Sequence, residues 1–260
     1  MSHKITTINE CEILSINNAH ASADIAMLGA TVMSYIPAGQ KDLLWLGKHN
    51  TFESGRAIRG GIPICWPRFA EDPLNDHLPR HGFARSTVWR FRGTLDTPDD
   101  GTTAIFALPP QTSFAANLML SIHVGKNLAL NLTTTAGDKT ITFADLFHTY
   151  FAVDDICRCK VSAAKKNDNW QAVCTDKPID TIFESKANLI LDDGRRKIKI
   201  EKENCDSTVI WNPYGNIGSE VQGDEYRGFV CVEAGNIGNN AITLRPGQSH
   251  VSRCIISHTR

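Results

Sequence analysis

The sequence predicts an all-β protein, a large antiparallel β-sandwich. Three observations support this fold class. Apolar and polar residues alternate along many short segments, as on strands with one buried face. Turn dipeptides such as Gly125-Lys126 and Asp193-Gly194 separate neighbouring segments, and no window carries a sustained helical stripe. Many short strands joined by tight turns are typical of packed antiparallel sheets. We expect one domain over residues 1–260, a length that can bury a full-sized core.

The clearest hairpin covers 118–133, where branched apolar residues take every second position on both sides of Gly125-Lys126. Glycine at the first central position predicts a two-residue turn there, and Asp100-Gly101 predicts another turn. Thr112–Asn117 and Ser219–Tyr226 could each hold a turn or two of helix. The other predicted strands are, in chain order, Glu12–Ile16, Ala21–Met27, Thr31–Ile36, Asp42–Leu46, Thr87–Asp96, Thr102–Leu108, Thr140–Val153, Ile156–Ala163, Leu189–Leu191, Arg196–Ile200, Thr208–Trp211, Arg227–Ala234 and His250–Ile256.

Composition limits the partners. A formal net charge of -1 and a pI near 6.7 provide no general basic field, so we expect neither nucleic acid nor an anionic membrane as a partner. No apolar run has membrane-spanning length, and Met1–Glu10 lacks the apolar centre of a signal peptide. The eight cysteines lie mostly inside apolar runs; Cys157 and Cys159 would share one face of a strand without metal-site spacing. These features predict a cytoplasmic protein with reduced, buried thiols.

A loop-like stretch from Arg59 to Arg85 concentrates cationic and imidazole side chains among glycines and prolines. Glycine permits close approach to the backbone and proline fixes φ, so this composition is typical of a rigid loop surface. Guanidinium forks match phosphate or carboxylate oxygens, and the set therefore predicts a site for a small anion. Any single arginine could instead pair with Glu71, Asp72 or Asp76. The set consists of Arg59, Arg68, Arg80, His81 and Arg85.

Two residues are candidates for acid–base chemistry. His148 shares a predicted strand face with Tyr150, which could hold the imidazole in one orientation with a pKa near neutrality; alone, it could equally be a core histidine. Glu233 lies within an apolar strand, where a carboxylate is rarely buried unless it is paired or functional. The alternative is a strand-end salt bridge from Glu233 to Arg227 or Arg245.

The remaining candidates are weaker. Asp180 could accept hydrogen bonds from ligand hydroxyls, although an aspartate after a proline and one further residue is commonly part of a turn. Core packing is the default role for Trp66, Trp89 and Trp211, with stacking on a sugar as the alternative. Neither phosphate-binding glycine motifs nor a nucleophile elbow occurs, and the histidines form no recognised metal-ligand spacing. No metal and no cofactor are predicted.

An ordered series of short motifs along nearly the whole chain resembles one family. It comprises Gly29-Ala30, Pro37-Ala38-Gly39, Arg59-Gly60-Gly61-Ile62-Pro63, Cys65-Trp66-Pro67, Leu78-Pro79, His81-Gly82-Phe83-Ala84-Arg85, His148-Thr149-Tyr150-Phe151, Trp211-Asn212-Pro213 and Val230-Cys231-Val232-Glu233-Ala234. The series is similar to that of the hexose-6-phosphate mutarotases, the glucose-6-phosphate 1-epimerase branch of the aldose 1-epimerase superfamily. The resemblance implies a galactose mutarotase-like β-sandwich that holds a hexose 6-phosphate on its concave face and exchanges α and β anomers.

The resemblance also implies roles for individual residues. His148 falls on the catalytic histidine and Glu233 on the catalytic glutamate. Arg59 and Arg85 fall on the arginines that bind the sugar phosphate, and Asp180 on the aspartate that holds sugar hydroxyls. His81 matches a histidine near the sugar, whereas Arg80 and Arg68 stand where the family carries other residues, so we expect extra charge to act on phosphate binding or sugar preference.

The implied reaction suits these residue types. Opening a hemiacetal ring needs a base at the anomeric hydroxyl and an acid at the ring oxygen, which a Glu233 carboxylate and a His148 imidazolium can provide. A monomer is expected, because no pattern indicates an obligate interface. Two other functions stay open: a non-catalytic sugar-phosphate-binding protein, and a glycosidase with Glu233 and Asp180 as its carboxylates.

Overall fold

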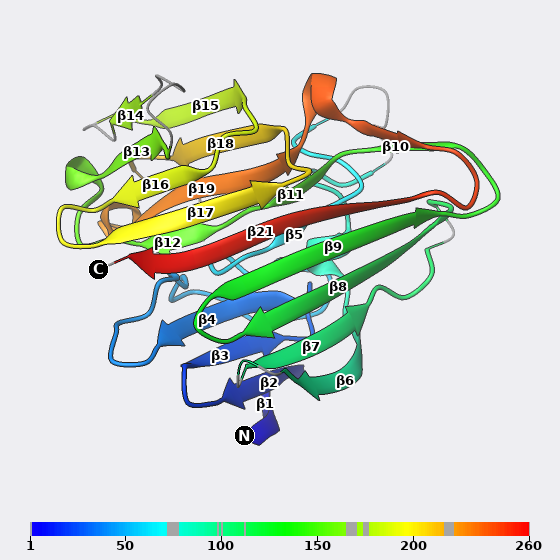
Figure 1. Cartoon of the computed structure of the whole chain (residues 1–260), viewed down its shortest axis with the longest axis horizontal. Helices are drawn as coiled ribbons and strands as arrows, with labels where there is room; N and C mark the ends of the chain where they lie inside the picture. The colour runs from blue at the N-terminus through cyan, green and yellow to red at the C-terminus, as the bar shows by residue number, and fades with distance from the viewer. Residues whose placement is uncertain are drawn as a thin grey trace.

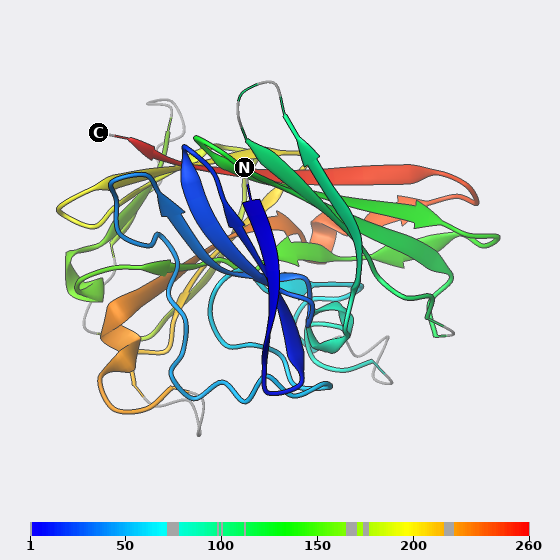
Figure 2. The same ribbon diagram turned by 90° about the horizontal axis from the view of Figure 1, so that it is seen from below.

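A computed structural model describes residues 2–71, 78–97, 99, 101–111, 113–164, 171–173, 177–215 and 221–259. Within these ranges the regular structure consists of β-strands and short 3-10 helices, so the all-β prediction is confirmed. Figures 1 and 2 show two main layers, with the long strands of one sheet lying over a second sheet that contains β19. No helix among the described residues has the length and apolar character needed to cross a membrane.

The larger layer is a nine-stranded sheet of order β14-β13-β16-β17-β21-β9-β8-β7-β6. All its neighbouring strands pair in antiparallel fashion. The strands are β6 (Arg90–Asp96), β7 (Thr102–Ala107), β8 (Ala116–Val124), β9 (Leu128–Ala136), β13 (Lys160–Ala163), β14 (Gln171–Val173), β16 (Leu189–Asp192), β17 (Lys197–Glu203) and β21 (Ser249–Thr259).

The second layer carries the residues of interest. It has the order β15-β18-β19-β11-β5, and β12 pairs with a further part of β19. Its strands are β5 (Ile64–Cys65), β11 (Asp145–Phe147), β12 (Tyr150–Ala152), β15 (Ile179–Glu184), β18 (Ser207–Asn212) and β19 (Phe229–Asn236). Along β19, Val230, Val232 and Ala234 enter the main core, whereas the alternate residues Cys231 and Glu233 point to the other face.

Two smaller sheets and four short helices complete the described structure. The N-terminal sheet has the order β1-β2-β3-β4, and β10 pairs with β20. Their bounds are β1 (Ser2–Ile8), β2 (Cys11–Asn17), β3 (Ala21–Ala26), β4 (Thr31–Pro37), β10 (Ile141–Phe143) and β20 (Ile242–Leu244). The 3-10 helices are η2 (Ala84–Ser86), η3 (Ile156–Arg158), η4 (Glu225–Gly228) and η5 (Gly238–Asn240).

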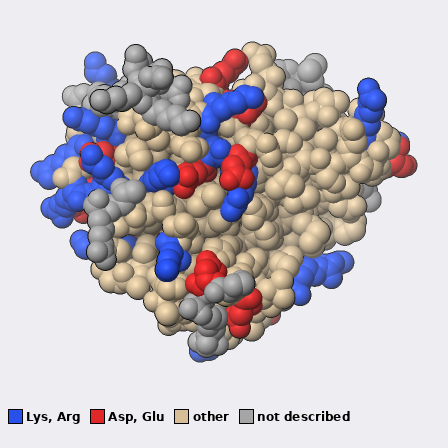
Figure 3. Space-filling view, viewed as in Figure 1, with Lys and Arg blue, Asp and Glu red and all other residues tan. Residues whose placement is uncertain are grey.

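The main core lies between the layers and draws apolar side chains from Leu14 to Ile256. Trp66 and Trp89 are fully buried in it, as predicted. On the outer face of the nine-stranded sheet, Figure 3 shows acidic and basic side chains interspersed and a largely uncharged surface over β8 and β9. None of the seven described cysteines forms a disulfide with another, and only Cys157 among them is exposed.

Several predicted elements are wrong in detail. Asp42–Leu46 forms isolated bridges at Leu44 and Leu46 instead of a strand, and the Asp42 carboxylate accepts the N–H groups of Tyr35 and Leu44. The Gly125 turn has three residues, since Val124 pairs with Leu128. The Asp100-Gly101 turn falls partly outside the described residues, at Asp100.

Other differences concern helices and long strands. Thr140–Val153 divides into β10, which pairs with β20, and β11 and β12, which pair with separate parts of β19. Ile156–Ala163 begins as η3 before β13, so the two cysteines there do not share a strand face. In Thr112–Asn117, Thr112 lies outside the described residues and Ala116 already pairs with Ala136 of β9. In Ser219–Tyr226, the described part contributes only to η4.

Candidate active site

Strand pairing places His148 opposite Glu233. Phe147 of β11 lies opposite Ala234, and Tyr150 of β12 lies opposite Cys231, so the register between these pairs brings position 148 against position 233. The Nδ1 atom of His148 is 3.6 Å from Oε1 of Glu233. On the side away from β19, the His148 N–H donates to the carbonyl of Pro63 at 3.0 Å, which continues the pairing of β11 with β5. Two residues distant in sequence thereby form a buried acid–base pair.

Aromatic rings fix the imidazole. The His148 ring stacks on Tyr150 with centroids 4.8 Å apart and an interplanar angle of 7°. Trp211 of β18 meets it edge-on at 6.1 Å. The expected sharing of one face by His148 and Tyr150 is therefore confirmed. Burial lowers the pKa of His148 well below its ordinary value, and the neighbouring His81, Arg85 and Arg59 lower it further.

The pKa of the Glu233 carboxyl group shifts in the opposite direction. Burial raises its pKa well above the ordinary value, and the negative charge of Asp180 adds to this rise, whereas Arg85 opposes it. Burial thus favours the uncharged form of both groups, a protonated Glu233 and a neutral His148. The anticipated salt bridge to Arg227 does not form, since Arg227 binds Asp155 at 2.9 Å.

A buried polar network holds β11 against β19 beside this pair. Asp145, at the start of β11, accepts hydrogen bonds from Asn236 of β19 at 2.9 Å and from Ser252 of β21 at 2.6 Å. Asn236 also donates to the carbonyl of Asn204 at 2.8 Å. These bonds join three strands three residues before His148 in sequence and three residues after Glu233, so they restrict sliding of one strand along the other.

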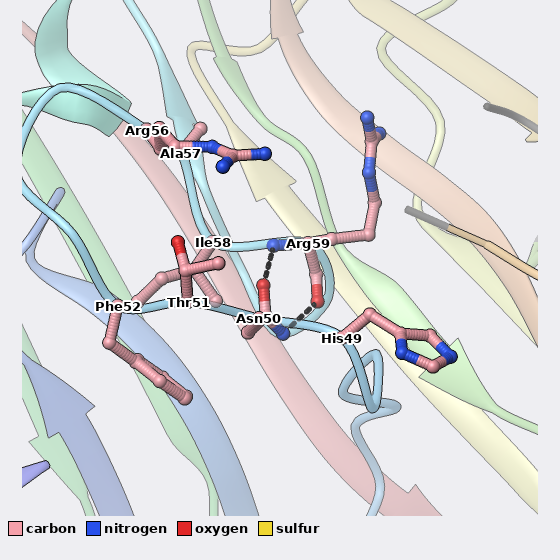
Figure 4. Close-up of a pocket in the computed structure, with 8 residues that line it drawn as sticks. All are labelled: His49, Asn50, Thr51, Phe52, Arg56, Ala57, Ile58 and Arg59. Carbon is pink, nitrogen blue, oxygen red and sulfur yellow. Dashed lines mark hydrogen bonds between the residues drawn. The ribbon is translucent and has the colours of Figure 1, made fainter. Parts of the chain in front are cut away.

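The loop after β4 delivers Arg59 to the same place. Gly61 has φ of +65°, and a side chain there would collide with the Val32 carbonyl, which explains the glycine. Asn50 pairs with the backbone of Arg59 through both its amide atoms, at 2.7 and 2.9 Å (Figure 4). Figure 4 also shows the Arg59 side chain pointing away from the small cavity, about 20 Å³, behind it. The guanidinium instead donates to the Tyr150 hydroxyl at 2.9 Å.

The second loop brings in His81 and Arg85. Gly82, with φ of +72°, lies where a side chain would collide with the Trp66 carbonyl. The N–H of Ala70 donates to Nδ1 of His81 at 3.1 Å, so the neutral ring carries its proton on Nε2. Burial and the surrounding arginines, Arg85 first, lower the pKa of His81 to about 3. This histidine is therefore a neutral hydrogen-bond donor, and Arg85 itself donates to the Arg80 carbonyl at 2.9 Å.

These groups line one cavity of about 260 Å³. Apart from Arg68, the structure brings together the predicted site residues there: Arg59, Arg80, His81, Arg85, His148, Asp180 and Glu233. Asp180 lies on β15 opposite Trp211 and not in a turn, and it is exposed. The cavity combines cationic groups, a neutral donor, an exposed carboxylate and a buried acid–base pair, so it can hold an anionic polyol and move protons on it.

Arg68 takes a different position from the one expected. Its side chain is buried, donates to the carbonyls of Ala70 and Leu78 at 3.1 and 2.8 Å, and lines a neighbouring cavity. It therefore braces the loop between β5 and η2. Two of the carboxylates that could pair with an arginine of this set, Asp72 and Asp76, lie outside the described residues.

Sequence reasoning missed four residues of the cavity wall: Phe69, Ala70, Ile182 and Val209. A fifth, Trp211, was given core packing as its default role and stacking on a sugar as the alternative. Val209 lies opposite Glu233 in the β18–β19 ladder, and Trp211 follows two residues later on the same face. The Trp211 ring packs, partly buried, against two apolar clusters and also borders the cavity.

Tyr150 joins the cationic loop to the acid–base pair, so its hydroxyl is a target for substitution. Tyr150→Phe keeps the ring beneath His148 but removes the acceptor for Arg59. Because hydrogen bonds to charged groups contribute about 1.5–3 kcal/mol, we expect at least a ~10-fold rise in KM for a phosphorylated substrate with kcat nearly unchanged. Steady-state kinetics on the phosphorylated and unphosphorylated forms of one sugar measure this, and equal effects on both would contradict the assignment.

Burial of Glu233 also predicts a pH-dependent stability. Its folded pKa lies above its unfolded value, so its contribution is fully present below the unfolded pKa near 4.5 and is lost as pH rises through the folded pKa. Glu233→Gln removes this loss. We expect the variant to melt at a higher temperature than the wild type in alkaline buffer, with the gap closing below pH 4.5. Glu53→Gln, at an exposed position, is the control and should melt in parallel with the wild type. Melting temperatures of Glu233→Gln that parallel those of the wild type at every pH would refute the prediction.

Comparison with known proteins agrees with this architecture. The family model for aldose 1-epimerase matches residues 12–257, and the chain belongs to that family. An Escherichia coli K12 relative, provisionally named a glucose-6-phosphate 1-epimerase, is 28% identical over 95% of this chain and 91% of its own. A crystal structure from Salmonella typhimurium, provisionally described as a mutarotase, superposes with a TM-score of 0.87 at 25% identity, over 99% of this chain and 94% of that one.

The wider fold is also shared. Galactose 1-epimerase from Lactobacillus acidophilus NCFM superposes with a TM-score of 0.71, at 16% identity, over 99% of each chain. The predicted galactose mutarotase-like β-sandwich is confirmed, as is the predicted family.

Proposed function

We propose that this protein is a hexose-6-phosphate mutarotase, an isomerase that exchanges the α and β anomers of glucose 6-phosphate and related hexose 6-phosphates. One observation carries the proposal: a single cavity contains the buried His148–Glu233 pair together with Arg59, Arg80 and Arg85. Membership of the aldose 1-epimerase family supports the reaction type. The name of the E. coli relative supports a phosphorylated hexose as substrate.

The arginines supply orientation. Arg59 and Arg85 bind the phosphate as charge-assisted hydrogen-bond donors, with the more exposed Arg80 at the rim. Asp180 accepts hydrogen bonds from sugar hydroxyls, and His81 donates one from Nε2. Holding the sugar at both ends converts proton transfer into a step within one complex.

The pair carries one proton between its members. Transfer from Oε1 of Glu233 to Nδ1 of His148, 3.6 Å apart, gives a carboxylate and an imidazolium. Glu233 then takes the anomeric hydroxyl proton while His148 protonates the ring oxygen, and the ring opens to the aldehyde. Rotation about C1–C2 and reclosure with the roles reversed gives the other anomer and restores the proton count.

Substrate binding itself favours the ionised pair. The positive charges of Arg85 and Arg59 lower the pKa of His148 in the free protein. A phosphate dianion between these arginines offsets their field, so the imidazolium becomes easier to form. The phosphate therefore contributes to kcat as well as to binding, and an unphosphorylated hexose should show a lower kcat and a higher KM.

The test is NMR saturation transfer between the anomers of several hexose 6-phosphates and of the corresponding free sugars. We expect exchange above the spontaneous rate for at least one hexose 6-phosphate and much slower exchange for its free sugar. Phosphate-dependent binding without exchange would instead indicate a sugar-phosphate-binding protein. Release of sugar from an aryl glycoside would indicate a glycosidase.

We further propose that the protein acts as a cytoplasmic monomer that needs no cofactor. The seven described cysteines form no disulfide with one another and are mostly buried, which suits a reducing compartment. Light scattering at micromolar concentration would test the monomer.

A further inference from the structure

The structure brings a third potential ligand beside the acid–base pair. Cys231 precedes Glu233 by two residues on β19, so both side chains lie on one face of the strand. A ring nitrogen of His148, Sγ of Cys231 and a carboxylate oxygen of Glu233 all lie within 4.8 Å of one another. The ligands come from two paired segments, which is why no spacing in the sequence revealed them.

Two buried polar atoms of this group are open to a ligand. Within the part of the chain that the structure describes, Nδ1 of His148 and Oε2 of Glu233 are buried without a hydrogen-bond partner. Both residues are more than nine-tenths buried, and both line the cavity. An unsatisfied buried polar atom is costly, so a ligand that engages these lone pairs gains free energy.

We propose that His148, Cys231 and Glu233 form a site for a thiophilic divalent cation such as Zn²⁺, which inhibits the protein. Zn²⁺ accepts one nitrogen, one sulfur and one oxygen ligand at about 2.0–2.3 Å, which requires ligand atoms roughly 3.5 Å apart. The observed 3.6 Å between Nδ1 of His148 and Oε1 of Glu233 meets this spacing, and Sγ of Cys231 lies within 4.8 Å of a ligand atom of each residue. Water from the cavity completes the tetrahedron.

The chemistry selects a soft cation. His148 binds as neutral imidazole, while the Cys231 thiol and the Glu233 carboxyl each release one proton to solvent on binding. A thiolate favours Zn²⁺ or Co²⁺ over Mg²⁺ or Ca²⁺. The positive charges of Arg59 and Arg85 repel any cation at this site. The affinity for the cation is therefore the attraction of the three ligands reduced by this repulsion. The cation takes the lone pairs that the proposed reaction needs, so metal binding and anomer exchange exclude each other.

The direct test is a Co²⁺ titration of the reduced protein under anaerobic conditions. We expect thiolate-to-Co²⁺ charge-transfer absorption that saturates at one equivalent, disappears with added Zn²⁺ and is unaffected by Mg²⁺. Cys231→Ala should lose it, with Cys231→Ser as the second variant should the first not fold. Cys65→Ala is the matched control, because Cys65 is also fully buried and lies outside the ligand group. No thiolate band in the wild type, or a band that survives in both Cys231 variants, overturns the proposal.

Inhibition is a second and separate measurement that rests on the proposed function. Zn²⁺ should stop exchange reversibly, with recovery in a chelator. Relative to each protein's metal-free rate, the half-inhibiting concentration should rise at least ~10-fold in Cys231→Ser, since loss of even an outer-shell partner typically costs that much. The spectroscopic result stands if no exchange activity is found, so failure of the two proposals can be told apart.

Discussion

Glu233→Gln is expected to lower the rate of anomer exchange by about 10²–10⁴-fold, the usual contribution of a positioned acid–base group. The amide keeps the size of the side chain but cannot carry the proton that it shares with His148 at 3.6 Å. His148→Asn should cause a loss of similar size, because it removes the other proton carrier. NMR saturation transfer on glucose 6-phosphate measures both effects.

A control and an additivity test sharpen this result. Glu184→Gln, at an exposed position on β15, should leave the rate unchanged. The double variant of His148 and Glu233 should lose little more than either single variant, because the two residues handle one proton as a unit. Near-normal exchange in either single variant, with the fold intact by circular dichroism, would eliminate the proposed mechanism.

Removing the phosphate-binding charge has the second largest expected effect. Arg59→Ala or Arg85→Ala should raise KM for glucose 6-phosphate by about 10–100-fold, since charge-assisted hydrogen bonds contribute roughly 1.5–3 kcal/mol. Exchange of unphosphorylated glucose should change much less, because no phosphate is bound. Steady-state exchange kinetics on both sugars separate this effect from misfolding.

Two further arginines calibrate the measurement. Arg80→Ala should have a smaller effect than either, because Arg80 is exposed at the cavity rim. Arg92→Ala, on the exposed surface of β6, should have none. Equal losses on glucose and glucose 6-phosphate would show that Arg59 and Arg85 support the fold and do not bind phosphate.

The hairpins and the fold class could be predicted because they depend on local patterns. Alternation over 118–133 specifies which face of β8 and β9 is buried, whatever the rest of the chain does. The predicted Gly125-Lys126 turn was one residue too short, because the pairing of Val124 with Leu128 leaves three residues between the strands. That register is fixed by the whole ladder. Strand ends depend on the partner, and the partner is not visible in a local pattern.

The same distinction explains the errors at Asp42 and along Thr140–Val153. The Asp42 carboxylate accepts two backbone N–H groups, which no apolar pattern records. The predicted strand Thr140–Val153 is divided because β10 pairs with β20, whereas β11 and β12 pair with separate parts of β19. His148 lies in the break between β11 and β12, where its N–H donates to the Pro63 carbonyl.

The sequence by itself determined the fold class, the family resemblance and the identities of the site residues, since alternation and residue type are properties of the chain alone. Only the tertiary structure decided that Glu233 faces His148, that Arg68 braces a loop, and that Cys231 and Trp211 border the pair. The reason is physical. Contacts between segments far apart in the chain, and the dielectric environment they create, set distances and pKa values that no local pattern contains.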